Sequence, residues 1–341
     1  MKNILLVLTG GTIGSFEKNG IIGTEKGKCR VLELFEEKYP DSDYQFEIKE
    51  PLNILSENLT CNDWETLINF ILSLDLSGFD GMIITHGSDT LSYSSAMLGM
   101  CLHGLGLPVV LTASNYVPDD TRSNALVNFK AAVELIQQVH DGVYTVYTNP
   151  PDLPSQLSHA FIPTRMKEAD RFMDCFYDID SIPFAIIDKT GDIREYGNDL
   201  NLQDLEGHQR FWDKQKFHFE KGVQLIHPYP SINYDNITIS ENTGAVLHIT
   251  YHSGTVSERA LTLLAKCKER NVPFFLCSLK SRAKAMYETS NILLQNGAVP
   301  LYDISTESAY AKLLLAVNLQ SDTMEEFMKK NIYFEITEEY E

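Results

Sequence analysis

The chain has little positive charge for its length. Among its 341 residues, 28 Lys and Arg stand against 47 Asp and Glu, which gives a formal net charge of −19. A field of this sign repels phosphate backbones, so we expect no nucleic-acid partner. Long apolar runs are missing too, and the five apolar residues at 4–8 are too few for a signal-peptide core. We therefore expect a cytoplasmic protein without a membrane segment.

Several cofactor signatures are also missing. No two of the six cysteines form a Cys-x-x-Cys pair, so we expect reduced, mostly buried thiols. The glycine-rich stretch at 9–14 lacks the spacing of a dinucleotide fingerprint, and no Gly-Lys-Ser/Thr follows it as in a phosphate loop. A dinucleotide or triphosphate site is therefore not indicated at this turn.

Strand and helix signals alternate along most of the chain. Short apolar runs at 81–85, 108–112 and 143–147 predict buried strands, and the stretches 90–105, 124–139 and 256–270 predict helices. This rhythm favours an α/β fold with a mainly parallel sheet and helices on both faces. Because the length favours two domains, we predict a larger domain over 1–188, a connection over 189–221 and a smaller α/β domain over 222–341.

The most informative turn follows the apolar run at 4–8 and reads Thr-Gly-Gly-Thr-Ile-Gly at 9–14. Ligands of parallel sheets gather at the carboxyl ends of strands, and glycines on both sides of Thr12 allow a substrate to approach closely. Thr12 is therefore a candidate nucleophile. A purely structural tight turn is the alternative interpretation.

A second turn repeats this design at 85–90, where Thr-His-Gly-Ser-Asp-Thr follows another apolar strand. It presents Ser88 and Asp89 where a helix begins, and the free N–H groups there suit an oxyanion or a carboxylate. An ordinary helix cap would use the same residue types. Two hydroxyl-bearing turns at one edge of one sheet favour a shared site.

Together, the motifs at 9–14 and 85–90 resemble those of the bacterial-type L-asparaginase family, most closely its cytoplasmic type I branch. Looser similarities occur at 56–60, 111–115, 122–124, 165–167 and 251–255. The resemblance implies an enzyme that hydrolyses L-asparagine to aspartate and ammonia without a metal or organic cofactor. It also implies a homodimer or homotetramer that binds a small amino-acid substrate.

The resemblance also implies roles for individual residues. Thr12 would form the acyl-enzyme, while Ser88, Asp89 and Lys167 would form a triad that moves protons. His86 is expected to be structural. The implied substrate-binding residues are Gly11, Ser56, Glu57, Gly87, Asp89 and Ser114.

Three departures from the family pattern leave alternatives open. Ser88 stands where threonine is usual, and Asn124-Ala125 replaces Asp-Gly. The loop at 15–22 has no tyrosine to close over the nucleophile, although Ile21 or Ile22 would exclude water. The alternatives are therefore a catalytically impaired protein that binds a small ligand, an amidase that prefers glutamine, and an amidase subunit that supplies ammonia to a tRNA-linked transferase.

Overall fold

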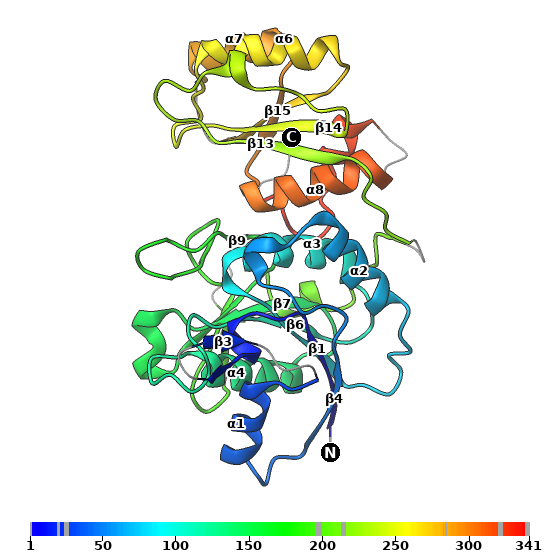
Figure 1. Cartoon of the computed structure of the whole chain (residues 1–341), viewed down its shortest axis with the longest axis vertical. Helices are drawn as coiled ribbons and strands as arrows, with labels where there is room; N and C mark the ends of the chain where they lie inside the picture. The colour runs from blue at the N-terminus through cyan, green and yellow to red at the C-terminus, as the bar shows by residue number, and fades with distance from the viewer. Residues whose placement is uncertain are drawn as a thin grey trace. The chain divides into compact units, whose positions relative to one another are not determined.

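The structure is a computed structural model that describes residues 2–18, 21–23, 27–195, 200–212, 216–281, 283, 285–319 and 323–337. The chain divides into two compact units, Met1–Lys216 and Phe217–Glu341. Each unit has its own sheet with helices packed on both faces, which confirms the predicted fold class (Figure 1). Among these described residues, no helix is both long and apolar enough to cross a membrane.

The larger unit contains an eight-stranded mixed sheet. Its first five strands run parallel to one another, and the last three run antiparallel to their neighbours. In spatial order the strands are β4 (Tyr44–Lys49), β1 (Lys2–Leu8), β5 (Gly81–Thr85), β6 (Val109–Thr112), β7 (Val143–Tyr147), β8 (Ser158–Phe161), β11 (Ala185–Ile187) and β12 (Ile193–Glu195).

The apolar run at 4–8 forms the inner part of β1, which lies between β4 and β5. Side chains 4–7 are completely buried, as expected for a parallel strand covered on both faces. The register pairs Leu8 with Thr85. Because the two strands run parallel and end together, the turns that follow them emerge side by side at the same edge.

Helices cover both faces of this sheet, with α1 and α4 on one side and α2 and α3 on the other (Figure 1). Their bounds are α1 (Arg30–Lys38), α2 (Cys61–Leu72), α3 (Leu91–Leu102) and α4 (Ala125–Gln138). In α4 the apolar face is buried at Phe129, Ala132, Val133 and Ile136, while Leu126 is half-buried. The helices predicted at 90–105 and 124–139 are thus confirmed, with ends a few residues shorter.

Two small hairpins extend from this unit. The first pairs β2 (Phe16–Lys18) with β3 (Ile21–Gly23) directly after the turn at 9–14. The side chains of Ile21 and Ile22, expected to cover the site, lie outside what the structure describes. The second hairpin pairs β9 (Met166–Lys167) with β10 (Tyr177–Asp178).

Much of the segment predicted to connect the domains belongs to the larger unit. Residues 193–195 form β12 of the large sheet, and α5 (Leu202–Leu205) follows. The indole N–H of Trp212 donates a hydrogen bond to the carbonyl of Met100 at 3.0 Å. The division at residue 216 therefore falls inside the predicted connection at 189–221, and Phe217 is already part of the smaller unit.

The smaller unit has a four-stranded parallel sheet with α6 and α7 on one face and α8 on the other (Figure 1). The predicted helix at 256–270 is shorter than expected, because residues 258–260 form a 3₁₀ turn before α6. The elements are β13 (Gly222–Ile226), β14 (Thr243–Ile249), α6 (Leu261–Glu269), β15 (Phe274–Leu279), α7 (Glu288–Gln295), β16 (Val299–Tyr302), α8 (Thr306–Leu319) and α9 (Met324–Lys329).

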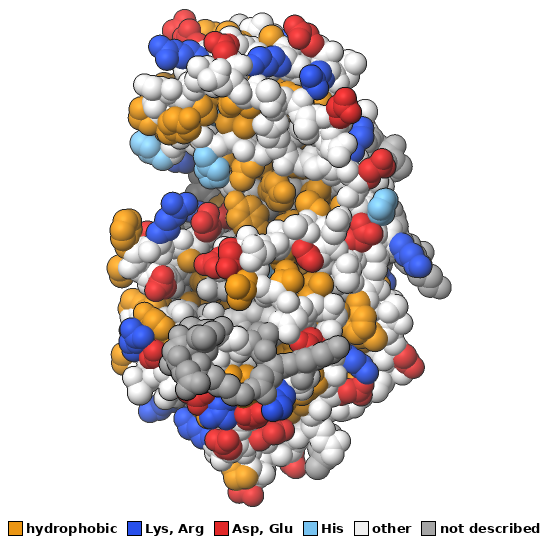
Figure 2. All heavy atoms as spheres, viewed as in Figure 1, with side chains coloured by type: hydrophobic (Ala, Val, Ile, Leu, Met, Phe, Trp, Pro, Cys, Tyr) orange, Lys and Arg blue, Asp and Glu red, His pale blue; other side chains and the backbone are white. Residues whose placement is uncertain are grey.

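Surface charge is mixed on the face drawn in Figure 2. Basic and acidic side chains lie among one another on the larger unit, and no extended basic patch is visible among the described residues on that face. The excess of acidic residues in the sequence is therefore spread over the surface there instead of gathered in one place.

Candidate functional site

The turns after β1 and β5 meet through two glycines. A Cβ built on Gly11 would lie 2.5 Å from the backbone nitrogen of Gly87 and 2.7 Å from its Cα. Gly11 also has a φ of +79°, a conformation that side chains disfavour. Thr12 follows Gly11 in the chain, and Ser88 follows Gly87. Each hydroxyl-bearing residue is therefore the immediate neighbour of one of the two glycines in contact.

A third segment, residues 54–58, joins the same place. Gly10 forms a parallel bridge with Ile54, and Ser56 is buried with its hydroxyl directly against Gly87. A Cβ on Gly87 would come within 2.4 Å of the Ser56 Oγ. Ser56 thus lies beside the second hydroxyl turn, while its neighbour Glu57 is exposed.

Hydrogen bonds hold these three segments in register. The Thr9 hydroxyl donates to the carbonyl of Thr85 at 2.8 Å, and the Thr90 hydroxyl donates to the carbonyl of Ser56 at 3.1 Å. Within the first turn, the Ser15 hydroxyl donates to the carbonyl of Gly11 at 2.8 Å. Side chains from both motifs therefore fix the backbone around the candidate nucleophile.

Both candidate hydroxyls begin short 3₁₀ turns and are accessible. Thr12 starts the turn Thr12–Gly14 and is half-buried. Ser88 starts the turn Ser88–Thr90, which runs directly into α3, and it too is half-buried beside the exposed Asp89. Free backbone N–H groups at this helical start favour a negative charge on a ligand.

A cavity of about 420 Å³ opens beside the second turn. This size is within the range of small-molecule sites. The aromatic rings of Tyr147 and Phe176, whose centroids are 4.7 Å apart, form one wall. The other lining residues are Ser88, Asp89, Asn115, Glu168, Ala169, Asp170, Arg171 and Asp174.

Among the described residues, no hydrogen bond or ion pair joins Lys167 to Ser88 or Asp89. Lys167 lies on β9 opposite Tyr177 and is exposed, and the cavity is lined by its neighbour Glu168 instead. Burial raises the pKa of nearby Asp178 to about 7, although the positive charges of Arg165 and Lys167 oppose this shift. The place of Lys167 in a triad remains a prediction.

His86 contacts the backbone of the second turn, and its structural role stays a prediction. It is buried, and burial lowers the pKa of its imidazole, which favours the neutral ring. Its Nδ1 donates to the carbonyl of Gly87 at 2.8 Å, which fixes that glycine. The hydroxyl of Ser114 donates a hydrogen bond within the protein, to the carbonyl of Tyr116 at 2.8 Å.

Two buried asparagines that were not recognised as site residues hold the turn after β6. The side chain of Asn124 accepts from the N–H of Asn115 at 3.1 Å and donates to the carbonyl of Thr148 at 2.8 Å. Asn128 likewise donates to the carbonyl of Ala113 and accepts from the N–H of Thr148, each at 2.8 Å. An aspartate at position 124 could only accept, so the departure Asn124-Ala125 has a structural role here.

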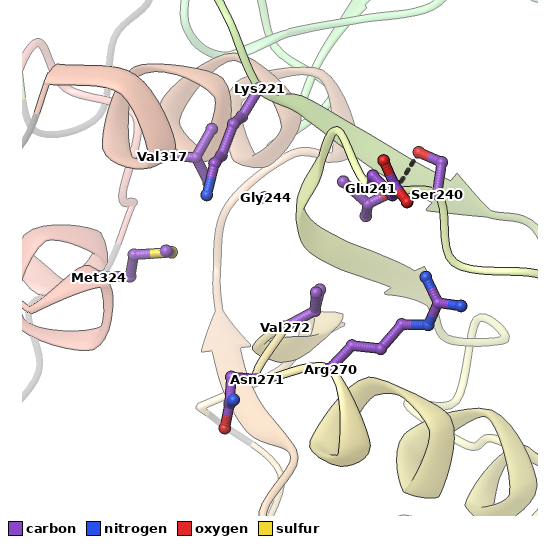
Figure 3. Close-up of a pocket in the computed structure, with 10 residues that line it drawn as sticks. Lys221, Ser240, Glu241, Gly244, Arg270, Asn271, Val272, Val317 and Met324 are labelled. Carbon is purple, nitrogen blue, oxygen red and sulfur yellow. Dashed lines mark hydrogen bonds between the residues drawn. The ribbon is translucent and has the colours of Figure 1, made fainter.

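A second cavity, of about 380 Å³, lies within the smaller unit where β13 and β14 begin (Figure 3). A Cβ on Gly244 would come within 2.8 Å of Val317, so a glycine allows α8 to pack closely there. The hydroxyls of Ser240 and Thr243 hydrogen-bond to each other at 2.8 Å. Because these two hydroxyls bond to each other, we look for the nucleophilic hydroxyl in the turns of the larger unit. The charged residues that line this second cavity are Lys221, Glu241 and Arg270.

Metal binding is not indicated by the side chains that the structure describes. In that part of the chain, no group of three or more His, Cys, Asp or Glu side chains is arranged to hold an ion. The chemistry that the described groups can support is attack by a hydroxyl, with backbone N–H groups beside it.

Replacing Gly11 by alanine is expected to disrupt the site, because the methyl group would overlap Gly87. Gly106→Ala is a matched control, since Gly106 also has a φ of +79° but nothing lies within 4 Å of a Cβ there. Backbone strain alone should cost each variant about 1–2 kcal/mol of unfolding free energy. Urea unfolding should show a clearly larger loss for Gly11→Ala, and equal losses would contradict the close approach.

Sequence comparison finds relatives that match this chain over most of its length. Two similar curated proteins are both subunits of a glutamyl-tRNA(Gln) amidotransferase. The one from Methanosphaera stadtmanae is 27% identical over 97% of this chain and 76% of its own length, and the one from Pyrococcus furiosus is 28% identical over 99% and 77%.

Solved structures share the fold. The thermostable L-asparaginase from Thermococcus kodakarensis superposes with a TM-score of 0.79 and 22% identity, covering 98% of this chain and 99% of that one. L-asparaginase I from Vibrio cholerae gives a TM-score of 0.73 and 21% identity, with the same coverage. Residues 3–194 match the family model for the N-terminal part of asparaginases. Since that match spans more than half of the chain, this protein belongs to the asparaginase family.

Proposed function

We propose that this amidohydrolase cleaves the side-chain amide of L-asparagine, with Thr12 as the nucleophile. The observation that carries the proposal is the contact between Gly11 and Gly87, which brings both hydroxyl turns to one point. The Thr12 hydroxyl attacks the amide carbon, and the leaving nitrogen takes up a proton and departs as ammonia. Water then attacks the resulting ester, releases aspartate and restores the hydroxyl.

The surrounding groups suit the remaining steps. Backbone N–H groups at the start of the Ser88–Thr90 turn would stabilise the oxyanion. Ser56 and Asp89 would hold the substrate's α-carboxylate and α-ammonium group, respectively. A hydroxyl needs a base near neutral pH, and we assign proton transfer to Ser88, Asp89 and Lys167.

A second candidate is a glutaminase that supplies ammonia to a partner enzyme. The names of the curated relatives favour it, since both belong to an amidotransferase that acts on glutamyl-tRNA(Gln). Asparagine and glutamine differ by one methylene, and discrimination at that level is about 1–3 kcal/mol.

One coupled assay tests both candidates. Ammonia release is measured from L-asparagine, L-glutamine and a β-aspartyl dipeptide, with kcat/KM compared among them. We expect asparagine to give the highest value. A preference for glutamine would replace the first candidate by the second, and thermal stabilisation by asparagine without turnover would indicate a binding protein.

A further inference from the structure

One segment, residues 168–174, supplies much of the wall of the cavity beside Ser88. Its lining side chains are Glu168, Ala169, Asp170, Arg171 and Asp174, and all of them except the half-buried Ala169 are exposed. The rings of Tyr147 and Phe176 behind them are almost completely buried. The segment 168–174 is therefore the part of this wall that is open to a ligand.

The segment is closed on itself around Asp170. The Oδ1 of its carboxylate accepts from the backbone N–H groups of Phe172 and Met173, each at 3.0 Å. Its own N–H donates to the carbonyl of Cys175 at 3.0 Å, and its carbonyl accepts from the N–H of Asp174 at 2.9 Å. An aspartate that bonds the backbone two and three residues ahead stabilises a tight turn. The exposed wall is thus one ordered turn.

The buried side chain of Asn149, which follows β7, ties this turn to the large sheet. Its Oδ1 accepts from the backbone N–H of Phe176 at 2.9 Å, and its Nδ2 donates to the carbonyl of Phe176 at 3.0 Å. The side-chain amide therefore pairs with Phe176 as a neighbouring antiparallel strand would. The ring of Phe176 also packs edge-on against Tyr147, with centroids 4.7 Å apart. Because Phe176 comes directly after the turn, Asn149 fixes where the turn begins to leave the sheet.

We infer that Asn149 is a positioning residue that holds the 168–174 turn in place beside the bound substrate. This inference rests on the proposed function. Asn149 is not one of the described residues that line the cavity, so it acts through the turn. A wall that is already ordered does not have to be ordered when the substrate binds, which favours binding. The same wall borders the ground state and the transition state, and such an interaction changes KM more than kcat.

The first test is Asn149→Leu, which has a similar size and removes both hydrogen bonds to Phe176. It should raise KM for L-asparagine on the order of 10-fold and change kcat by less than about threefold. Asn318→Leu is the matched control, because the Asn318 side chain likewise bonds the backbone N–H and carbonyl of one residue, Lys221, in the smaller unit. Both variants should unfold at lower urea concentration, but only Asn149→Leu should change KM. An unchanged KM in Asn149→Leu, or a loss confined to kcat, overturns the inference.

The second test uses the exposed Asp170 and does not require the buried variant to fold. Asp170→Ala removes the acceptor that closes the turn and should raise KM in the same way. Asp170→Asn keeps an oxygen at that position and should retain the wild-type KM. An unchanged KM in Asp170→Ala contradicts the role of the turn. An equal rise in both variants would show that the charge of Asp170 acts on the substrate directly, and it would overturn the inference too.

Binding distinguishes a failure of this inference from a failure of the proposed function. If the wild-type protein releases no ammonia, the proposed function has failed, and calorimetry then measures the Kd for L-asparagine. Binding that is about 10-fold weaker in Asn149→Leu and unchanged in Asn318→Leu supports the positioning role. Equal affinity in all three proteins, or no binding by the wild-type protein, overturns it.

Discussion

Thr12→Ala is expected to lower kcat/KM for asparagine by on the order of 10⁴-fold or more, as removal of the nucleophile does in other acyl-transfer enzymes. The unfolding midpoint should change little, because Thr12 is only half-buried at the start of a short turn. The measurement is ammonia release, with circular dichroism to confirm that the variant folds.

Two further variants make this result specific. Thr12→Ser keeps a hydroxyl and should retain part of the activity, with a loss that reflects the missing methyl group. Ser88→Ala keeps the nucleophile and should slow the reaction less than Thr12→Ala. If Ser88→Ala instead abolishes the reaction while Thr12→Ala retains it, the nucleophile belongs to the second turn.

The second large effect is on stability, at a buried ion pair in the smaller unit. Lys312 on α8 and Glu335 are both completely buried, with Nζ and Oε1 2.7 Å apart. Lys312 also donates to the carbonyls of Met328 and Lys330, while Glu335 accepts from the N–H groups of Ile332 and Tyr333. Lys312→Met should lower the unfolding free energy by about 3–5 kcal/mol, because it leaves a buried carboxylate without its counter-charge.

The pH dependence gives an independent check. Burial alone would raise the pKa of Glu335, but Lys312 and the two backbone N–H groups outweigh burial and lower it. A carboxyl with a lowered folded pKa stabilises the fold above its unfolded value of about 4.3, and this contribution is lost as the pH falls through the folded pKa. In Lys312→Met, burial dominates and raises that pKa. The stability difference between the two proteins should therefore be largest near neutral pH and shrink in acid.

A double variant provides the control. Lys312→Met combined with Glu335→Leu removes both charges, and much of the lost stability should return. Urea unfolding monitored at several pH values measures all three proteins. A single variant as stable as the wild type, or a difference that grows in acid, would contradict the role of this pair.

The strands and helices that frame the site could be predicted because local pattern decides them. The runs at 4–8 and 81–85 are buried on both faces of the sheet. Such strands are apolar throughout, so the local sequence alone is enough to predict them. The pairing of the two hydroxyl turns followed from one topological rule, that parallel strands end at a common edge. The 3₁₀ turn before α6 was not predicted, because one turn of 3₁₀ helix and one turn of α-helix have similar residue patterns in the sequence.

Other features depend on tertiary contacts that leave little trace in a sequence. Nothing local distinguishes Asn124 or Asn128 from ordinary polar residues, and both side chains hydrogen-bond to the backbone of Thr148, which lies 24 and 20 positions away, respectively. Lys312 and Glu335 resemble surface charges until the fold buries them together. Lys167 differs from these residues, because its role in proton transfer comes from a family pattern and stays a prediction.

The position of β1 between β4 and β5 has a consequence for synthesis on the ribosome. The strand that carries the Thr12 turn emerges first, yet both strands that pair with it come later in the chain. Until residues 81–85 have left the exit tunnel, an apolar segment of the nascent polypeptide lacks one of its neighbours, and such segments attract chaperones or other unfinished chains. The arrangement of the strand at 2–8 is thus complete only after residues 81–85 have been made.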